Sequence, residues 1–138
     1  MALTLNATAG SPNANAYCTT TEADNYHDTR IHNTAWENAE RSDRKAAIVW
    51  ATRIIDESVY WVGNKRSSAQ ALGWPRTAVW DHEGDAISSS TVPSFIKNAT
   101  SEMAFHLVNE DRTLETNRDL QGFKSMQLGA GGELKVDI

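Results

Sequence analysis

The chain has 138 residues, of which 40 % are hydrophobic and 22 % are charged. This length suits one domain of ordinary size, and this composition excludes a natively disordered chain. No apolar run approaches the roughly 18 residues that would span a bilayer, and no basic segment precedes an apolar one near Met1, so we expect neither a membrane span nor a secretory signal. A single cysteine, Cys18, excludes an intrachain disulfide and a cysteine-based zinc site.

The charge balance restricts the possible partners. Eighteen Asp and Glu residues against thirteen Lys and Arg residues give a net charge of −5. The cations are dispersed, and the nearest approach to a cluster is Lys65-Arg66 with Arg76 further along. Proteins that hold nucleic acid need a basic face to neutralise phosphates. The balance therefore disfavours tight DNA binding by the isolated chain, although a small basic patch is available.

The predicted fold class is mainly α: a small helical bundle with a short β-hairpin near residues 77–87 and an extended or β-hairpin C-terminal tail. We divide the chain into an extended N-terminal arm over residues 1–18, a helical core domain over residues 19–111 and a C-terminal arm or hairpin over residues 112–138. The arm is rich in Asn, Ala, Thr and Gly, which is typical of a segment outside the core.

A first helix is expected to begin between Thr19 and Thr21 and to end by Asn33. Glu22 stands three residues after Thr19. This is the spacing of a capping box, in which each side chain accepts a hydrogen bond from the other residue's backbone N–H.

A short helical turn with Trp36 and Ala39 should follow, and then a long helix over residues 43–58 that Ser42 caps. The apolar stripe of the long helix makes it the spine of the predicted core. The stripe consists of Ala47, Trp50, Ala51, Ile54 and Ile55.

Residues 60–76 show no regular pattern, and Pro75 favours an extended conformation in the residue before it. Two short runs on either side of Gly84 predict the hairpin, because glycine supplies the positive φ of a tight turn. Pro93 suits the first turn of a helix, where its missing N–H costs nothing. A second amphipathic helix should start there and end between Asn109 and Asp111.

The last segment alternates apolar and polar residues around a glycine-rich stretch at 129–132. Two strands joined by a glycine turn fit this pattern, and a docking arm fits it nearly as well. Because two strands alone are marginal in water, their apolar face must cover its own core or another subunit. The residues of that face are Phe123, Met126, Leu128, Leu134, Val136 and Ile138.

No motif of a phosphate-binding loop, a dinucleotide fold, a zinc protease or a serine hydrolase occurs, so we expect no enzyme, no cofactor and no metal site. Residues 81–85 gather four metal-ligating side chains but lack the spacing of a calcium loop, which favours a polar turn over a metal site or a small hydrolase. We expect His27 and His106 to be packing residues.

Five tryptophans in a chain of this length allow two interpretations. They could form a stacking platform for single-stranded bases. Alternatively, Trp50 lies in the helical stripe while the other four cover a small core. A stacking groove needs interleaved positive charge, whereas Glu37 follows Trp36 and Asp81 follows Trp80, which favours the second interpretation.

Several short sequence motifs occur in the order seen in small proteins of tailed phages and prophages. Over residues 10–110 the chain resembles the head–tail connector, or adaptor, family, some members of which carry the label of primosome-like single-stranded-DNA-binding proteins. These motifs are Pro12-Asn13-Ala-Asn-Ala-Tyr17, Glu22-Ala-Asp-Asn-Tyr26, Trp36, Lys45-Ala-Ala-Ile48, Ala51-Thr52, Ala71-Leu-Gly-Trp-Pro-Arg76, Asp81 with Gly84 and Ile87, and Val92-Pro93 with Ile96-Lys97.

The resemblance implies a non-catalytic virion protein at the neck, or head–tail junction, made in the host cytoplasm. Such a protein assembles as a homo-oligomeric, dodecameric ring on the portal, extends the DNA channel and offers a docking surface to tail or neck proteins. DNA would pass through without sequence-specific binding, and no membrane would be involved. The alternative label implies a single-stranded-DNA-binding replication protein.

Two groups of residues receive roles from this reading. Trp74, Pro75, Arg76 and Trp50 are expected to be structural anchors. Trp74 should lie buried between the two long helices, with Arg76 held by a carboxylate or by backbone carbonyls. The apolar face of the tail, from Phe123 to Ile138, would be the interface with a neighbouring subunit or the portal.

Overall fold

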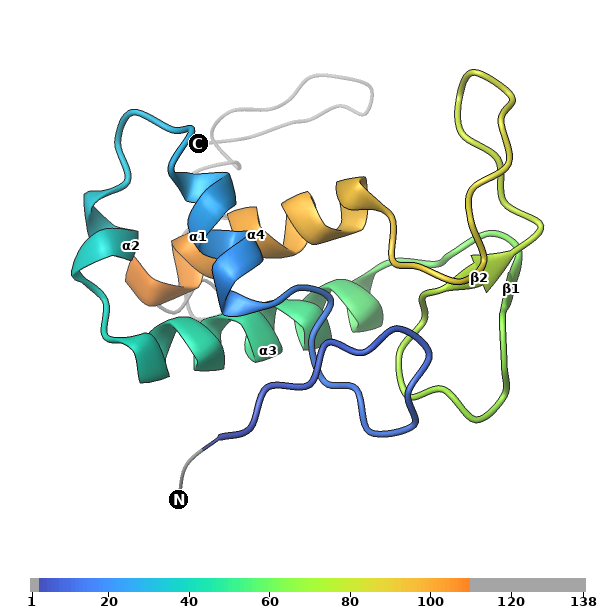
Figure 1. Cartoon of the computed structure of the whole chain (residues 1–138), viewed down its shortest axis with the longest axis horizontal. Helices are drawn as coiled ribbons and strands as arrows, with labels where there is room; N and C mark the ends of the chain where they lie inside the picture. The colour runs from blue at the N-terminus through green and yellow to red at the C-terminus, as the bar shows by residue number, and fades with distance from the viewer. Residues whose placement is uncertain (1–2, 110–138) are drawn as a thin grey trace, which may run out of the picture.

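Two long helices, α3 (Arg41–Ser58) and α4 (Ser94–Asn109), pack against each other and form the centre of the molecule (Figure 1). The structure is a computed structural model, and it describes residues 3–109. Two shorter helices, α1 (Thr20–His27) and α2 (Thr34–Asn38), contact α4 at one end of this pair. The mainly helical fold class is therefore confirmed, while the predicted tail over residues 112–138 lies outside the described part.

Helix α1 begins as the sequence predicts. The Thr19 hydroxyl accepts a hydrogen bond from the backbone N–H of Glu22, and the Glu22 carboxylate accepts one from the backbone N–H of Thr19. The helix ends at His27 and not at Asn33, because the next backbone N–H groups close tighter turns onto Tyr26 and His27. The Asn33 amide then donates to the His27 carbonyl, which satisfies an end of the helix.

The starts of the later helices differ in detail from the expectation. The short turn around Trp36 is present as α2. Helix α3 begins at Arg41 after Glu40, so Ser42 lies inside its first turn and does not cap it. Helix α4 begins at Ser94, and the carbonyl of the preceding Pro93 accepts hydrogen bonds from two N–H groups of its first turn.

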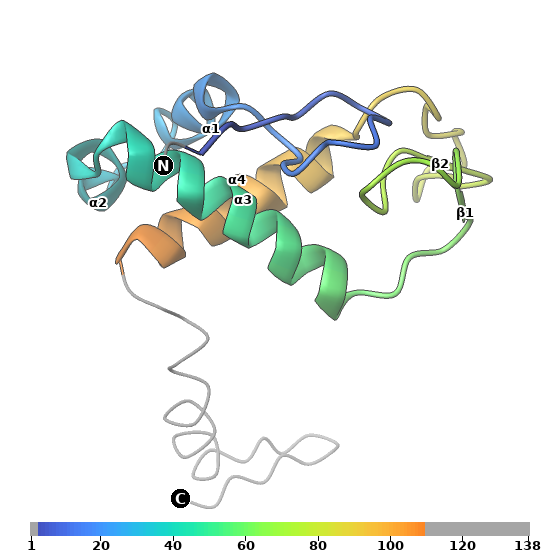
Figure 2. The ribbon, with the colours of Figure 1, turned by 90° about the horizontal axis from the view of Figure 1, so that it is seen from below.

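The segment predicted as an N-terminal arm joins the core at its end: Ala14, Ala16, Tyr17 and Cys18 are buried, whereas none of residues 3–13 is. Ala16 and Cys18 belong to the larger hydrophobic cluster, and Tyr17 belongs to the smaller one. Ala16 and Cys18 have small side chains, so the backbone of this segment can approach α3 closely. The backbone N–H of Tyr17 donates to the hydroxyl of Thr52 on α3 at 3.1 Å. In Figure 2 this N-terminal segment runs beside the helical pair.

The core consists of two clusters. The larger one lies between the helices and the N-terminal segment, and it contains Ala16, Cys18, Ala23, Trp36, Ala47, Ile48, Ala51, Ala104 and Leu107. The smaller one lies where the end of α3 and the start of α4 meet the loop layer, which is the connection between these two helices, residues 59–93. It contains Tyr17, Trp74, Val79, Val92 and Ile96.

The β-structure is arranged differently from the predicted hairpin near 77–87. The two antiparallel strands are β1 (Asn64–Lys65) and β2 (Arg76–Thr77), with Lys65 opposite Arg76. Residues 79–87 also fold back on themselves as predicted, through an isolated antiparallel bridge between Trp80 and Ala86 that backbone hydrogen bonds from Asp81 to Asp85 and from Ile87 to Val79 flank. The turn itself contains Gly84 at a φ of +88°, as the sequence predicted. The Arg76 side chain binds the carbonyls of Val62 and Gly63, just before β1, as described below.

Candidate functional site

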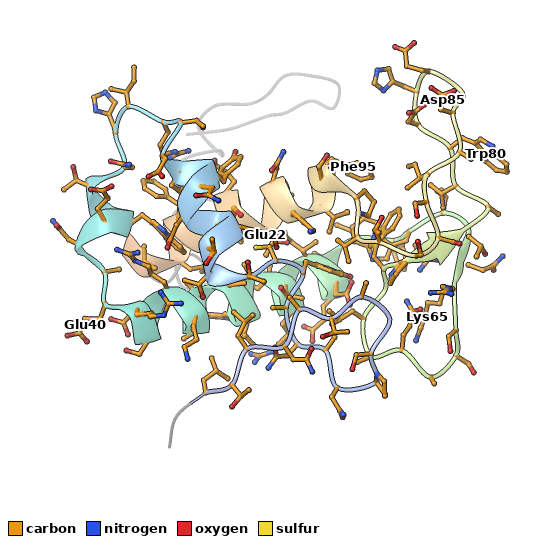
Figure 3. All side chains as sticks on the ribbon, viewed as in Figure 1. Glu22, Glu40, Lys65, Trp80, Asp85 and Phe95 are labelled. Atoms are coloured by element: carbon orange, nitrogen blue, oxygen red, sulfur yellow. The ribbon has the colours of Figure 1, made fainter. Side chains whose placement is uncertain are left out.

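A groove of about 520 Å³ opens at the end of the molecule that carries β1 and β2, and aromatic side chains line much of it. Tyr60 is fully exposed, Trp80 is 61 % exposed and Phe95 is 51 % exposed. Figure 3 shows Trp80 and Phe95 at this end. Large exposed aromatic side chains that share one hollow are typical of a binding surface. The aromatic groove is lined by Tyr60, Trp61, Val62, Trp74, Val79, Trp80, Asp81, His82, Ile87 and Phe95.

Trp74 forms the buried floor of the aromatic groove. It is 3 % exposed and belongs to the smaller core cluster. Its ring meets Trp61 at a centroid distance of 5.6 Å and Phe95 at 5.8 Å, both edge to face. This geometry is the favourable one for aromatic rings. The groove thus rests on rings from the loop after α3, the loop before β2 and the first turn of α4.

Arg76 holds the backbone beneath the groove. Its guanidinium donates to the carbonyls of Val62 at 2.7 Å, Gly73 at 2.9 Å and Gly63 at 2.9 Å. A planar group with fixed donors can bind three carbonyls from two loops at once. Of the two partners that the sequence allowed, backbone carbonyls and a carboxylate, the structure has the carbonyls.

Asp56, near the end of α3, joins the other side of the groove to the core. Its carboxylate accepts hydrogen bonds from the hydroxyl of Tyr17, from the indole of Trp61 at 3.3 Å and from the backbone of Gly73 at 3.0 Å. Burial and the neighbouring carboxylate raise the pKa of Tyr17, so its phenol stays protonated. These hydrogen bonds consequently tie the groove to α3 and the N-terminal segment.

The acidic loop 81–85 is a turn that its own side chain closes. One carboxylate oxygen of Asp81 accepts hydrogen bonds from the backbone N–H groups of Glu83 and Asp85, both at 2.9 Å. Within residues 3–109, no group of three His, Cys, Asp or Glu side chains could hold a metal ion. The two hydrogen bonds give Asp81 a structural role in the turn.

Charges of both signs surround the aromatic groove. Lys65 and Arg66 are exposed on β1 and just after it, while Asp81, Glu83 and Asp85 are exposed on the loop. In Figure 3, Trp80 lies between Lys65 and Asp85. The exposed cations Lys65 and Arg66 lie on the β1 side and do not line the groove.

The predicted site residues fall into three groups. Trp74, Pro75 and Arg76 lie together beneath the groove, as described. Trp50 lies in the middle of α3, half-buried beside Leu107 and against the larger cluster. The tail residues Phe123, Met126, Leu128, Leu134, Val136 and Ile138 lie outside the described residues.

The tryptophans divide between the two interpretations that the sequence allowed. Trp36 is a core residue whose indole donates to Asp24 at 2.8 Å. Trp61, Trp74 and Trp80 converge on the groove. Sequence reasoning missed Tyr60 and Phe95; for Phe95 the available signal was a large aromatic residue directly before the core residue Ile96.

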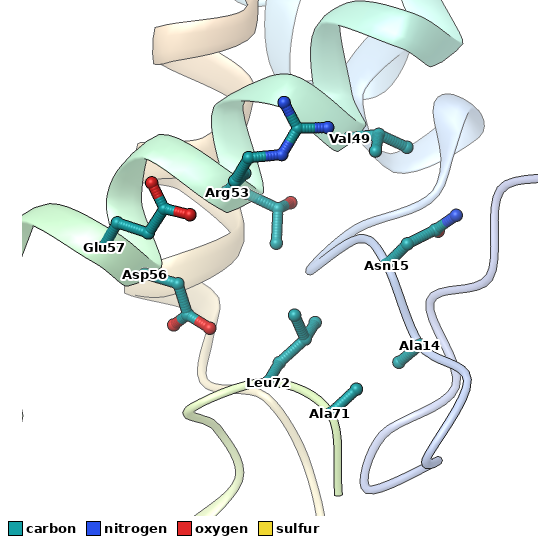
Figure 4. A pocket seen from close by; sticks show the side chains of 9 residues that line it. Ala14, Asn15, Val49, Arg53, Asp56, Glu57, Ala71 and Leu72 are labelled. Atoms are coloured by element: carbon teal, nitrogen blue, oxygen red, sulfur yellow. The ribbon is translucent and has the colours of Figure 1, made fainter.

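A second hollow of about 410 Å³ lies on the opposite side of Asp56 (Figure 4). The side chains of Arg53 and Glu57 extend from α3 above it, and Asn15 and Leu72 border it from the N-terminal segment and the loop layer. Its lining mixes both charges and has no aromatic side chain, so it lacks the features of a stacking surface.

None of the helices in the described part of the chain is long and apolar enough to cross a membrane.

Comparison with known proteins supplies the family. No curated protein and no solved structure matches the chain. One family model matches residues 1–130, and its description is "Putative DnaT-like ssDNA binding protein". This label corresponds to the alternative that the resemblance carried, and the chain belongs to this DnaT-like family.

Proposed function

We propose that the chain binds single-stranded DNA by stacking bases on the aromatic groove. The observation that carries the proposal is the presence of three exposed aromatic side chains, Tyr60, Trp80 and Phe95, around one apolar hollow. Every base has a π-face, so such a surface binds single strands without reading sequence. The description of the family supports the same ligand.

Phosphates of the strand would lie on the β1 side of the groove. Lys65 and Arg66 are exposed there, and the acidic loop 81–85 repels a polyanion on the other side. Two phosphate contacts predict a modest salt dependence, with log K falling against log salt at a slope of about −1.4 at most. Stacking, and not charge, would supply most of the affinity.

The test is a titration of the full chain with a fluorescently labelled oligothymidine at low salt. Trp80→Ala should weaken binding by roughly 5- to 150-fold, which corresponds to the loss of one stacked base. Trp50→Phe is the matched control, because Trp50 packs against the larger cluster and does not line the aromatic groove. The proposal fails if the wild-type chain does not bind, or if Trp80→Ala binds as tightly as the control.

A second candidate function is the head–tail connector role. We propose it as a non-catalytic virion subunit that forms a ring on the portal, contacts tail or neck proteins and lets DNA pass through its channel. The net charge of −5 and the acidic loop beside the groove favour a protein partner over a polyanion. The exposed apolar groove would then seat a side chain of a neighbouring subunit in a head-to-tail ring.

Electron microscopy of the purified protein, alone and mixed with its portal, tests this second candidate. Rings that form with the wild-type chain and not with Trp80→Ala would assign the groove to subunit contact. A chain that stays monomeric in both samples argues against the connector role. The oligothymidine titration on the same preparations separates the two candidates.

A further inference from the structure

Trp74 brings to the aromatic groove a hydrogen-bond donor without an acceptor. Its indole Nε1–H is buried and has no hydrogen-bond partner among residues 3–109. The residue is 3 % exposed, and it lines the groove. Buried polar groups nearly always have a partner, because a buried donor has lost its hydrogen bond to water. An unpaired donor on a residue that lines a hollow therefore points to a ligand with an acceptor atom.

Other indole groups of the protein show the contrast. The Trp36 indole, in the larger core cluster, donates to the Asp24 carboxylate at 2.8 Å. The Trp61 indole, which lines the same groove as Trp74, donates to the Asp56 carboxylate at 3.3 Å. Each of these two donors has an acceptor within the described fold. The acceptor for Trp74 has to come from elsewhere, and the aromatic groove is the hollow that Trp74 lines.

Phe95 is the more readily displaced of two rings that pack edge to face on Trp74. The other ring, that of Trp61, is held by its hydrogen bond to Asp56. Phe95 is 51 % exposed, and a phenyl ring has no polar atom that could anchor it (Figure 3). A ligand that reaches the buried N–H of Trp74 would therefore turn the ring of Phe95 aside.

We propose that the Trp74 N–H donates a hydrogen bond to a carbonyl oxygen of a base in the aromatic groove, an inference that rests on the proposed binding of single-stranded DNA. The base would take the place of the Phe95 ring beside Trp74. Thymine, cytosine and guanine carry a carbonyl oxygen, and adenine carries none. Stacking by itself accepts every base. The groove would thus prefer the bases that carry a carbonyl oxygen over adenine.

The test compares two labelled oligomers on the full chain. One is oligothymidine, and the other is the oligomer of its difluorotoluene isostere, in which fluorine replaces both carbonyl oxygens. The isostere keeps the shape and the π-face of thymine, but its fluorine atoms are poor acceptors. Trp74→Phe removes the N–H and keeps a ring in the core. In this variant the preference for oligothymidine, given by the ratio of the two Kd values, should fall by roughly 5- to 10-fold, as expected for one hydrogen bond.

Trp36→Phe is the matched control, because Trp36 is similarly buried and belongs to the other core cluster. It should leave the ratio of the two Kd values as in the wild-type chain. The same ratio in Trp74→Phe would overturn the inference, and stacking in the groove would then stand by itself. If the wild-type chain binds neither oligomer, the proposed function is wrong and the inference falls with it.

A second measurement needs only the wild-type chain and so does not depend on the folding of Trp74→Phe. A new hydrogen bond moves the resonance of its proton downfield. The indole proton of Trp74 should therefore shift downfield in the nuclear magnetic resonance spectrum when oligothymidine binds, and it should shift less with the isostere. Equal shifts of this proton with both oligomers would contradict a hydrogen bond from Trp74 to the base.

Discussion

At the scale of single residues, the groove depends on close approach between two loops. Arg76 binds the carbonyls of Val62, Gly63 and Gly73, and this contact draws the loop after α3 against β2. Gly63 lies at the point of contact with a φ of +75°. No other residue type fits this position, because both the backbone conformation and the space exclude a Cβ atom.

Gly63→Ala should therefore destabilise the protein more than Gly84→Ala. A Cβ on Gly63 would overlap the Thr77 carbonyl and lie 2.6 Å from the Val79 side chain. Gly84 also has a positive φ, but a Cβ there meets nothing within 4 Å. We expect Gly84→Ala to cost about 1–2 kcal/mol for the backbone alone, and Gly63→Ala to cost about 1–3 kcal/mol more. Urea unfolding of both variants measures the difference, and equal costs would contradict the close approach.

Trp74 and Trp80 line the same groove but should respond differently to truncation. Trp74 is a buried core residue, so Trp74→Ala should cost about 3–5 kcal/mol of stability. Trp80 is mostly exposed, so Trp80→Ala should change stability by about 0.5 kcal/mol or less. Urea unfolding of both variants measures these costs. A Trp74→Ala variant that unfolds like the wild-type chain would show that Trp74 acts in binding and not in packing.

At the scale of elements, α1 and α4 are joined by a polar network over a buried histidine. The Glu102 carboxylate pairs with Arg30 at 2.6 Å and accepts the Tyr26 hydroxyl at 3.0 Å. Beneath it, His27 is fully buried and contacts the Ser101 carbonyl through Nε2 at 2.8 Å. Burial disfavours the charged imidazole and lowers the pKa of His27 below its ordinary value of 6.5.

This polar network and the buried His27 should make the free energy of unfolding depend on pH in two steps. The unfolded chain binds a proton at His27 more readily than the folded chain, so stability present above pH 6.5 is lost as pH falls below that value and through the lower folded pKa. For Glu102, burial disfavours the charged form, but hydrogen bonds from Arg30 and Tyr26 outweigh it and lower the pKa. Its contribution is lost at more acid pH, as pH falls below 4.5.

The variant His27→Gln should remove the first step and keep the second. Glutamine is neutral at every pH and retains a donor for the Ser101 carbonyl. Free energies of unfolding between pH 3 and pH 8 measure both steps. An unchanged slope between pH 5 and pH 7 in the variant would show that His27 is not the titrating group.

At the scale of the whole molecule, the described residues contain two core clusters that lie along the helical pair. Every buried member of the larger cluster lies between Ala16 and Leu107, and every buried member of the smaller one lies between Tyr17 and Ile96. The helical pair α3–α4 connects the two clusters along its length. We predict that this unit folds without residues 112–138.

A chain cut after Asp111 should keep its helical core and a cooperative melting transition. Circular dichroism at 222 nm during heating measures this, with the full chain as the control. We further expect the cut chain to lose any contact with neighbouring subunits or the portal that the tail residues make. Loss of the cooperative transition would instead place residues 112–138 in the core.

The sequence by itself determined the helices, because their signals are local. Thr19 and Glu22 cap α1 from three residues apart, and the apolar stripes of α3 and α4 follow the period of one helix. Boundaries moved where side chains from elsewhere intervened, as when Asn33 satisfied the end of α1 at His27.

Only the tertiary structure decided the rest. Tyr60, Trp80 and Phe95 share a groove because Arg76 and Asp56 bind distant backbone groups, and such long-range hydrogen bonds leave no local pattern in the chain. The same applies to the N-terminal segment, whose small residues are typical of a loop but lie buried against α3. Whether an aromatic side chain is core or surface depends on what the fold places over it, and that is a property of the packed molecule and not of neighbouring residues.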